Sequence, residues 1–415
     1  MTSWLSGLVF VALCAAIAAL VAGCSDDTPP VGGTLSPDVS STAGIVPHGA
    51  ASPTFVVRPE RRTGGWLVHV RDGDIVVSAL DGSDEVTLSL PGNAPHRAGF
   101  GGVADIGGTR WLYFATQLSQ RGTGTDFPIG EYALVRAPLG ESAVEEVMRF
   151  EALAGSGRGQ AWIAPDGSRV LHRGMDEIVV RDLVTGSSSV LFDGSCAEQP
   201  NTKCEMYGSP MFSPTGDAMI AKHHYYETSS AAFASPVTST DARELREYGG
   251  ELQAWSPDGG TFCTYSVAFV PAGVWLVDAR TLAAEDLSRR FAEGTQIEGC
   301  WPGPGAMVAV MFRPAGDVGF APSVAIFAPG SRERAHTFTL PDFWRIEGWL
   351  THGSGLVVSK SNNCTPCNPD EPLVATVTFD GGMHALPFRV ATTATSERDT
   401  SFVLAIVADQ ATAPE

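Results

Sequence analysis

Apolar positions beyond residue 54 fall in short β-branched runs that stop at turns rich in Gly, Pro and Asp, and no 3.6-residue periodicity is present after residue 24. Each run stops at a Gly-containing or polar turn and resumes as a second short run, which is the pattern of a β-hairpin. The pattern predicts an all-β chain. Seven such hairpins are expected, the last of them irregular, at residues 73–83, 131–141, 176–187, 273–283, 323–333, 373–382 and 231–246.

A second motif places an aromatic residue just before a polar turn. It occurs five times, 43 to 50 residues apart, at Trp162, Phe212, Trp255, Trp301 and Trp349. Periods of this length are typical of repeat proteins, in which one supersecondary unit needs its neighbours to bury its apolar faces. We therefore predict four antiparallel strands per unit in a radial arrangement: a single β-propeller with seven blades, and eight blades as the alternative.

The last apolar run, SFVLAIVA at residues 401–408, is left over once the hairpins are counted. We expect this strand to complete the sheet that begins near Thr54. Pairing the two ends of the propeller closes the ring and removes two exposed sheet edges.

The stretch QAWSPDGG at residues 253–260 suggests why the motif repeats. Pro257 presets φ, Asp258 can bond the backbone of its own turn, and Gly259 supplies a positive φ. We expect Trp255 to pack between sheets. A structural role for Asp258 is favoured over calcium binding, because no D-x-D-x-D spacing accompanies it.

The segments WSPDGG, IAPDGS and FSPTGD resemble the repeats of TolB-type and other WD40-like (PD40) β-propellers. The resemblance covers residues 160–305 well and residues 54–408 weakly. It implies the propeller fold and is almost silent about function, because propellers host enzymes, binding proteins and scaffolds alike.

The first 23 residues carry no ionisable side chain, and residues 5–21 form an almost unbroken apolar run. The tetrad Val21-Ala22-Gly23-Cys24 resembles the lipobox of bacterial lipoproteins, although the usual Lys or Arg before the apolar run is missing. The resemblance implies cleavage before Cys24 and lipidation of its thiol. An uncleaved membrane-anchoring helix is the alternative, since about 20 apolar residues suffice to span a bilayer.

The segment after Cys24 is dominated by Ser, Thr, Pro, Gly and Asp, and it has too few large apolar groups to offset the entropy of ordering. This order of segments predicts a protein of the bacterial cell envelope, anchored by lipid to the membrane on the periplasmic face or at the cell surface. The predicted parts are a signal peptide at 1–23, the lipidated Cys24 with a flexible linker at 24–53, the propeller at 54–408 and a tail at 409–415.

The charge balance is strongly acidic, because 46 Asp and Glu oppose 27 Lys and Arg and give a formal net charge of -19. Such a chain repels polyanions. Its lysines, Lys203, Lys222 and Lys360, form no cluster that could follow a phosphate backbone. We expect no nucleic-acid binding.

Six cysteines follow the signal and the lipobox, and they fall into natural pairs. An even number in an exported chain indicates a disulfide framework, whose connectivity the sequence leaves open. A redox dithiol is the alternative for the last pair, and we disfavour it because no helix N-terminus is evident to lower a thiolate pKa. The expected pairs are Cys196 with Cys204, Cys263 with Cys300, and Cys364 with Cys367.

The densest set of metal-capable side chains is His223-His224-Tyr225-Tyr226-Glu227. Adjacent residues of a strand point to opposite faces, so His223 and His224 cannot share one ion without a loop or bulge. We expect a solvated strand end here, with no metal site and no cofactor.

No G-x-S-x-G, Walker A, HExxH or dinucleotide fingerprint occurs, and no catalytic residue is predicted. The leading hypothesis is a monomeric, non-catalytic binding or scaffold protein for an envelope protein or polymer. A second is an axial-site enzyme, a lyase or hydrolase, whose polar groups converge from several blades and leave no linear motif. A third is a carbohydrate-binding propeller that uses exposed aromatics such as Tyr225, Tyr226 or Trp344.

Overall fold

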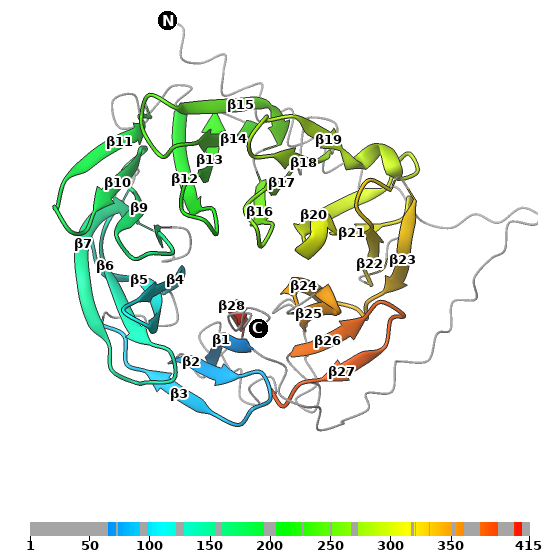
Figure 1. The fold of residues 1–415 in the computed structure, drawn as a ribbon, viewed down its shortest axis with the longest axis horizontal. Helices are drawn as coiled ribbons and strands as arrows, with labels where there is room; N and C mark the ends of the chain where they lie inside the picture. Colours follow the sequence, from blue (N-terminus) through cyan, green and yellow to red (C-terminus); the bar gives the residue numbers. More distant parts are fainter. Residues whose placement is uncertain are drawn as a thin grey trace, which may run out of the picture. The chain divides into compact units, whose positions relative to one another are not determined.

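Seven four-stranded antiparallel sheets, arranged radially, make up the described part of the chain in the computed structural model (Figure 1). The expected all-β fold with seven blades is confirmed. All described residues belong to the second of the two units into which the chain divides, Ser52–Glu415. They are residues 65–71, 74–91, 98–121, 128–154, 160–194, 205–225, 228–249, 251–266, 273–316, 319, 321–331, 333–350, 353–360, 374–388 and 402–408.

Each blade runs from an innermost strand to an outermost strand at the rim, and the blades are numbered 1 to 7 from the sheet that contains β1 (Figure 1). The innermost strands are β28 (Phe402–Ala408), β4 (Gly99–Ile106), β8 (Ala161–Ile163), β12 (Glu205–Phe212), β16 (Glu251–Trp255), β20 (Gln296–Pro302) and β24 (Trp344–Trp349). The second strands are β1 (Gly65–Arg71), β5 (Thr109–Arg121), β9 (Arg169–Arg173), β13 (Met219–Tyr225), β17 (Thr261–Tyr265), β21 (Val308–Arg313) and β25 (Gly355–Lys360).

The outer half of each blade is a hairpin, and these hairpins contain the seven expected from the sequence. The third strands are β2 (Asp74–Ala79), β6 (Ile129–Pro138), β10 (Ile178–Asp182), β14 (Thr228–Ala234), β18 (Val274–Asp278), β22 (Ser323–Phe327) and β26 (Val374–Thr378). The outermost strands are β3 (Glu85–Leu88), β7 (Glu145–Leu153), β11 (Ser188–Phe192), β15 (Ala242–Gly249), β19 (Ala284–Asp286), β23 (Arg334–Thr339) and β27 (Met383–Ala385).

Helical structure in the described residues consists of two short 3-10 turns, η2 (Leu287–Arg290) and η3 (Pro304–Ala306). Within those residues, no helix has the length and apolar character needed to cross a membrane.

Burial falls from the inner strands of a blade to its rim. Strand β21, with the sequence VAVMFR, is buried at every position but the last, whereas β23, with RAHTFT, is exposed at every position but one. An inner strand has a neighbouring blade on each face and so requires apolar residues on both faces, while an outermost strand meets solvent. This explains why the inner strands read as continuous apolar runs.

In the described residues the hydrophobic core consists of seven clusters, and each lies between two adjacent blades. For example, one cluster joins Phe212 and Met219 of blade 4 to Leu171 and Ile178 of blade 3. Another joins Leu67 of blade 1 to residues of blade 7. A single blade therefore buries little on its own, and its stability depends on both neighbours.

The C-terminal strand closes the ring, as the sequence predicts. β28 pairs antiparallel with β1 and takes the innermost place in blade 1, where Figure 1 shows it in red beside the blue β1. Val407 of β28 enters the core cluster between blades 1 and 2. Within the described residues the sheet begins at Gly65, and the expected start near Thr54 lies outside them.

The polar turns of the repeat have the predicted structure. Asp258 accepts hydrogen bonds from the Ser256 hydroxyl (2.6 Å) and the Gly260 backbone amide (3.0 Å), and Gly259 has φ 72°. These bonds use the carboxylate to hold its own turn. Trp255 packs in the cluster between blades 4 and 5, as expected for a residue between sheets.

Cys263 on β17 and Cys300 on β20 form a disulfide, with their Cα atoms 6.0 Å apart. The bond joins the second strand of blade 5 to the first strand of blade 6, and both cysteines are fully buried between these blades. The other two expected pairs, Cys196 with Cys204 and Cys364 with Cys367, lie outside the described residues, as does Cys24.

Candidate functional site

Blade 4 gathers polar side chains on the face that it turns toward blade 3. The register places Tyr207 of β12 opposite His223 of β13, and His223 opposite Ser230 of β14. Residues directly opposite one another share a face of the sheet. Strand β14 contributes small side chains here, including Ser230 and Ala232, so the His223 imidazole approaches Glu244 on β15, two strands away.

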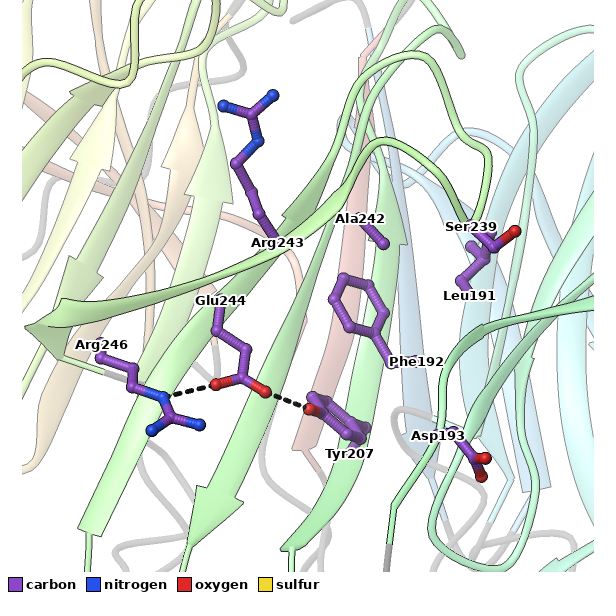
Figure 2. Close-up of a pocket in the computed structure, with 9 residues that line it drawn as sticks. All are labelled: Leu191, Phe192, Asp193, Tyr207, Ser239, Ala242, Arg243, Glu244 and Arg246. Carbon is purple, nitrogen blue, oxygen red and sulfur yellow. Dashed lines mark hydrogen bonds and ion pairs between the residues drawn. The ribbon is translucent and has the colours of Figure 1, made fainter.

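Glu244 is the centre of a hydrogen-bonded network at the rim. The Tyr207 hydroxyl donates to Glu244 Oε1 at 2.6 Å, and Arg246 Nε donates to Glu244 Oε2 at 2.6 Å. Figure 2 shows Glu244 between these two partners. Arg246 Nη2 also lies 3.6 Å from Oε1 of Glu205, the first residue of β12. One guanidinium thus contacts two carboxylates.

His223 lies beneath this network. Its side chain is 2% exposed, and its ring stacks on Tyr207 with the ring centroids 4.6 Å apart and an interplanar angle of 17°. Nδ1 lies 3.0 Å from the Ser230 hydroxyl and 3.9 Å from Glu244 Oε2. Within the described part of the chain, Nε2 is buried without a hydrogen-bond partner.

The environment sets the protonation of these groups. Burial lowers the pKa of His223 more than the charges of Glu244 and Glu205 raise it, so the imidazole is neutral at pH 7. Burial and the hydrogen bond to Glu244 raise the pKa of Tyr207. Burial acts to raise the pKa of Glu244, but the hydrogen bonds from Tyr207 and Arg246 outweigh it, so the pKa is lowered overall. This carboxyl is therefore ionised at neutral pH.

A pocket of about 460 Å³ opens beside the network, between the rims of blades 3 and 4. One side is apolar and includes Leu191 and Phe192 of β11, and the other carries the polar groups of β15 (Figure 2). Phe192 also packs on Tyr207, with ring centroids 5.1 Å apart, so the apolar side of the pocket contacts the hydrogen-bonded network directly. The lining residues are Leu191, Phe192, Asp193, Tyr207, Ser239, Ala242, Arg243, Glu244 and Arg246.

The structure corrects the expectation of a solvated strand end at residues 223–227. His223 is buried because blade 3 packs over this face of blade 4, whereas His224, on the opposite face, is partly exposed. The alternation of faces was predicted correctly. The wrong step was to judge burial from neighbours in the sequence alone. The side chain of Tyr225 and the residues Tyr226 and Glu227 are outside the description.

Trp344, named as an exposed aromatic for carbohydrate binding, is 4% exposed. It packs in the core cluster between blades 6 and 7 together with Ile346 and Leu340. This part of the carbohydrate hypothesis is wrong, because the indole is covered by the neighbouring blade.

Sequence reasoning missed Glu205, Tyr207, Glu244 and Arg246. A partial signal was present, since Glu205 and Tyr207 are two apart, as are Glu244 and Arg246, and residues two apart on a strand share a face. Nothing in the sequence indicated that both pairs lie on the face that carries His223.

The fold and the site together define a seven-bladed β-propeller with a polar pocket between two blade rims. No protein-family model matches the sequence, and no curated protein matches it either. Solved structures similar to this chain share only the fold with it, and they include the following three.

A TolB from Acinetobacter baumannii is 14% identical (TM-score 0.37), with 66% of this chain aligned to 63% of that structure, so the chain spans less than two thirds of its length. An oligogalacturonate lyase from Vibrio parahaemolyticus is 12% identical (TM-score 0.43), with 75% and 89% of the two chains covered. The Cps50 (Swd1) β-propeller domain from Myceliophteria thermophila is 12% identical (TM-score 0.46), with 73% and 92% covered.

Proposed function

We propose that this chain is a lipid-anchored β-propeller of the bacterial cell envelope that binds a partner protein, without catalysis, through the pocket between blades 3 and 4. The observation that carries the proposal is the pocket itself, which places the aromatic rings of Phe192 and Tyr207 beside a hydrogen-bonded set of polar groups. In binding pockets, a small number of placed polar groups fixes the orientation of the bound molecule.

The envelope location is supported by two independent features. The apolar run at residues 5–21 followed by Cys24 resembles a lipoprotein signal. The disulfide between Cys263 and Cys300 requires an oxidising compartment to persist, which favours an exported protein over a cytosolic one.

The arrangement of the polar groups favours binding over catalysis. The Tyr207 proton is donated to Glu244, and both oxygens of Glu244 accept hydrogen bonds from Tyr207 and Arg246. Groups that satisfy one another in this way hold a fixed pattern of charge. A catalytic acid or base would instead have to offer its proton or lone pair to a substrate.

The lining of the pocket favours a protein segment over a uniformly charged polymer. The lining includes two acidic residues, Asp193 and Glu244, and two basic residues, Arg243 and Arg246, beside the apolar Leu191 and Phe192. A surface with both signs of charge and an aromatic centre resembles the core and rim of a protein interface. An envelope polymer of one repeated charge would leave half of these groups without a complement.

The test is site-specific photo-crosslinking of the intact lipoprotein in native membranes. A photoreactive residue in place of Ser239 at the pocket should capture one protein species, and the substitution Arg243→Glu should abolish that capture. The matched control places the same photoreactive residue at Ser83, an exposed turn serine of blade 1.

Three outcomes would contradict the proposal. Capture of the same species from Ser83, or capture from Ser239 that survives Arg243→Glu, would show that the pocket does not select the partner. Turnover of an envelope polymer by the purified chain would favour the axial-site enzyme instead.

A further inference from the structure

The side chains beneath the pocket meet the distance requirement of a metal site. One ring nitrogen of His223 and one oxygen from each of Glu205 and Glu244 all lie within 4.8 Å of one another. Among the described residues this is the one group of three such ligands. The three residues come from three strands of the same blade, β12, β13 and β15, so the sheet holds their backbones in place.

Bonds from nitrogen and oxygen ligands to a divalent transition metal are about 2.0 to 2.2 Å long, so two ligand atoms of one tetrahedral ion lie roughly 3.3 to 3.6 Å apart. His223 Nδ1 and Glu244 Oε2 are 3.9 Å apart, so the imidazole and this carboxylate are neighbours that lie a little too far apart for one ion. No two of the three ligand atoms are more than 4.8 Å apart, so side-chain rotations that move them by roughly 1 Å bring them onto one ion.

Two partly buried carboxylates lie close together in this group. Glu205 and Glu244 have side-chain exposures of only 29% and 22%, and Arg246, which lies against both of them, has a side-chain exposure of 69%. Because its side chain is mostly in solvent, releasing it requires little free energy, in keeping with the small contribution of exposed ion pairs.

The buried imidazole is a second observation that points to a ligand. Its side chain is 98% buried, since 2% is exposed, and its Nε2 has no hydrogen-bond partner in the described residues. A buried ring nitrogen without a hydrogen-bond partner costs free energy. Coordination of a metal through Nε2 would remove this cost and leave the Ser230 hydroxyl as the partner of Nδ1.

We propose that Glu205, His223 and Glu244 bind a divalent first-row transition metal, with Zn²⁺ preferred to Mn²⁺, and that Arg246 occupies the same place when the metal is absent. An imidazole with two carboxylates suits such ions better than Mg²⁺ or Ca²⁺, which prefer oxygen ligands alone. The sequence predicted no metal site, although His223 belongs to its densest set of metal-capable side chains. Three protein ligands leave a position open to water or to a bound group, and Glu244 and Tyr207 place that position at the pocket.

This inference goes beyond the binding of a partner protein and does not depend on it. The metal is tested on the purified, detergent-solubilised full chain without any partner. The partner test relies on Ser239 and Arg243, which belong to the pocket but not to the three ligands. Failure of either experiment therefore leaves the other interpretable.

The experiment is equilibrium dialysis against Zn²⁺ and Mn²⁺ with metal analysis, followed by calorimetric titration, on protein that carries no polyhistidine tag. The wild-type chain should bind one equivalent of Zn²⁺. Glu205→Gln and Glu244→Gln should each weaken binding by at least the roughly 10- to 100-fold that loss of an outer-shell partner produces. The matched control is Glu298→Gln, which alters a mostly buried Glu that pairs with Arg313 in blade 6.

Arg246→Gln distinguishes a metal site from a simple ion-pair cluster. It keeps all three ligands and removes the competing cation, so the affinity for Zn²⁺ should rise by about fivefold, the size of one exposed ion pair. Near-UV circular dichroism of each variant checks that the fold is retained. Absence of a bound equivalent in both wild-type and Arg246→Gln protein overturns the proposal, and so does binding that Glu205→Gln and Glu244→Gln leave unchanged.

Discussion

Closure of the ring by β28 predicts that a small truncation of one buried side chain on this strand destabilises blade 1. Val407 lies on the closing strand, is 4% exposed and packs in the cluster between blades 1 and 2. Val407→Ala removes two methyl groups from this cluster and leaves the backbone pairing with β1 intact. Val190, which is 45% exposed on the outermost strand of blade 3, provides the same substitution at a site that is not buried.

The expected magnitude follows from burial. Two methyl groups contribute about 1.6 kcal/mol of transfer free energy, at about 0.8 kcal/mol each, and the cavity that remains adds about 1 kcal/mol. Val407→Ala should therefore lower the free energy of opening of the closing strand by about 2.5 kcal/mol. Val190→Ala should change stability by less than about 0.5 kcal/mol.

Hydrogen exchange measured by mass spectrometry reports this change strand by strand. In Val407→Ala, the amides of β1 that pair with β28 should exchange about 60-fold faster, because each 1.4 kcal/mol is a factor of ten. Val190→Ala should leave these amides at the wild-type rate. If β1 exchanges equally in both variants, β28 does not stabilise blade 1, and the argument for closure by the C-terminal strand fails.

Three further predictions concern the disulfide between blades 5 and 6, the pH dependence of stability and two glycine turns. Replacing Cys263 and Cys300 by Ser removes a crosslink between residues 37 apart, and urea titration should show a loss of about 4 kcal/mol; unchanged midpoints would contradict the crosslink. Burial, aided by a neighbouring arginine, lowers the pKa of His69 from 6.5 to about 4. Below pH 6.5 the unfolded chain binds a proton at His69 that the folded chain does not bind. The free energy of unfolding should therefore be highest above pH 6.5 and fall by about 3 kcal/mol toward pH 4. His69→Gln should remove this pH dependence. Gly167 and Gly186 both have φ 73°, but a Cβ at Gly167 would meet a blade 2 side chain at 2.3 Å while Gly186 faces open space. Gly167→Ala should thus lower Tm more than Gly186→Ala, which costs only about 1 kcal/mol of backbone strain; equal shifts would refute the contact.

The candidate site depends on information that is not local in the sequence. Glu205, His223 and Glu244 are separated by about twenty residues each along the chain. They meet because the register of β12 and β13 sets Tyr207 opposite His223, and because the pairing of β14 with β15 shifts register between Ser230 and Ala231. A slip of one residue in any of these strands would move its side chains to the other face. No pattern in the sequence reveals that register.

The burial of the site's side chains could not be predicted from the sequence either. His223 is 2% exposed because the rim of blade 3, with Phe192 packed on Tyr207, covers its face of the sheet. The same effect buries Trp344, which reads as an exposed aromatic when only its own strand is considered. Exposure in a propeller is decided by the neighbouring blade, which comes from a distant part of the chain.

The sequence by itself determined the strands, the turns and the number of blades, because each of these follows from interactions within a few residues. Pro257, Asp258 and Gly259 specify their turn through their own backbone preferences, and the apolar runs specify strands that are buried on both faces. Only the tertiary structure decided which side chains face one another across the boundary between blades 3 and 4. That outcome depends on strand register and on blade-to-blade packing, two long-range properties that no single stretch of the chain contains.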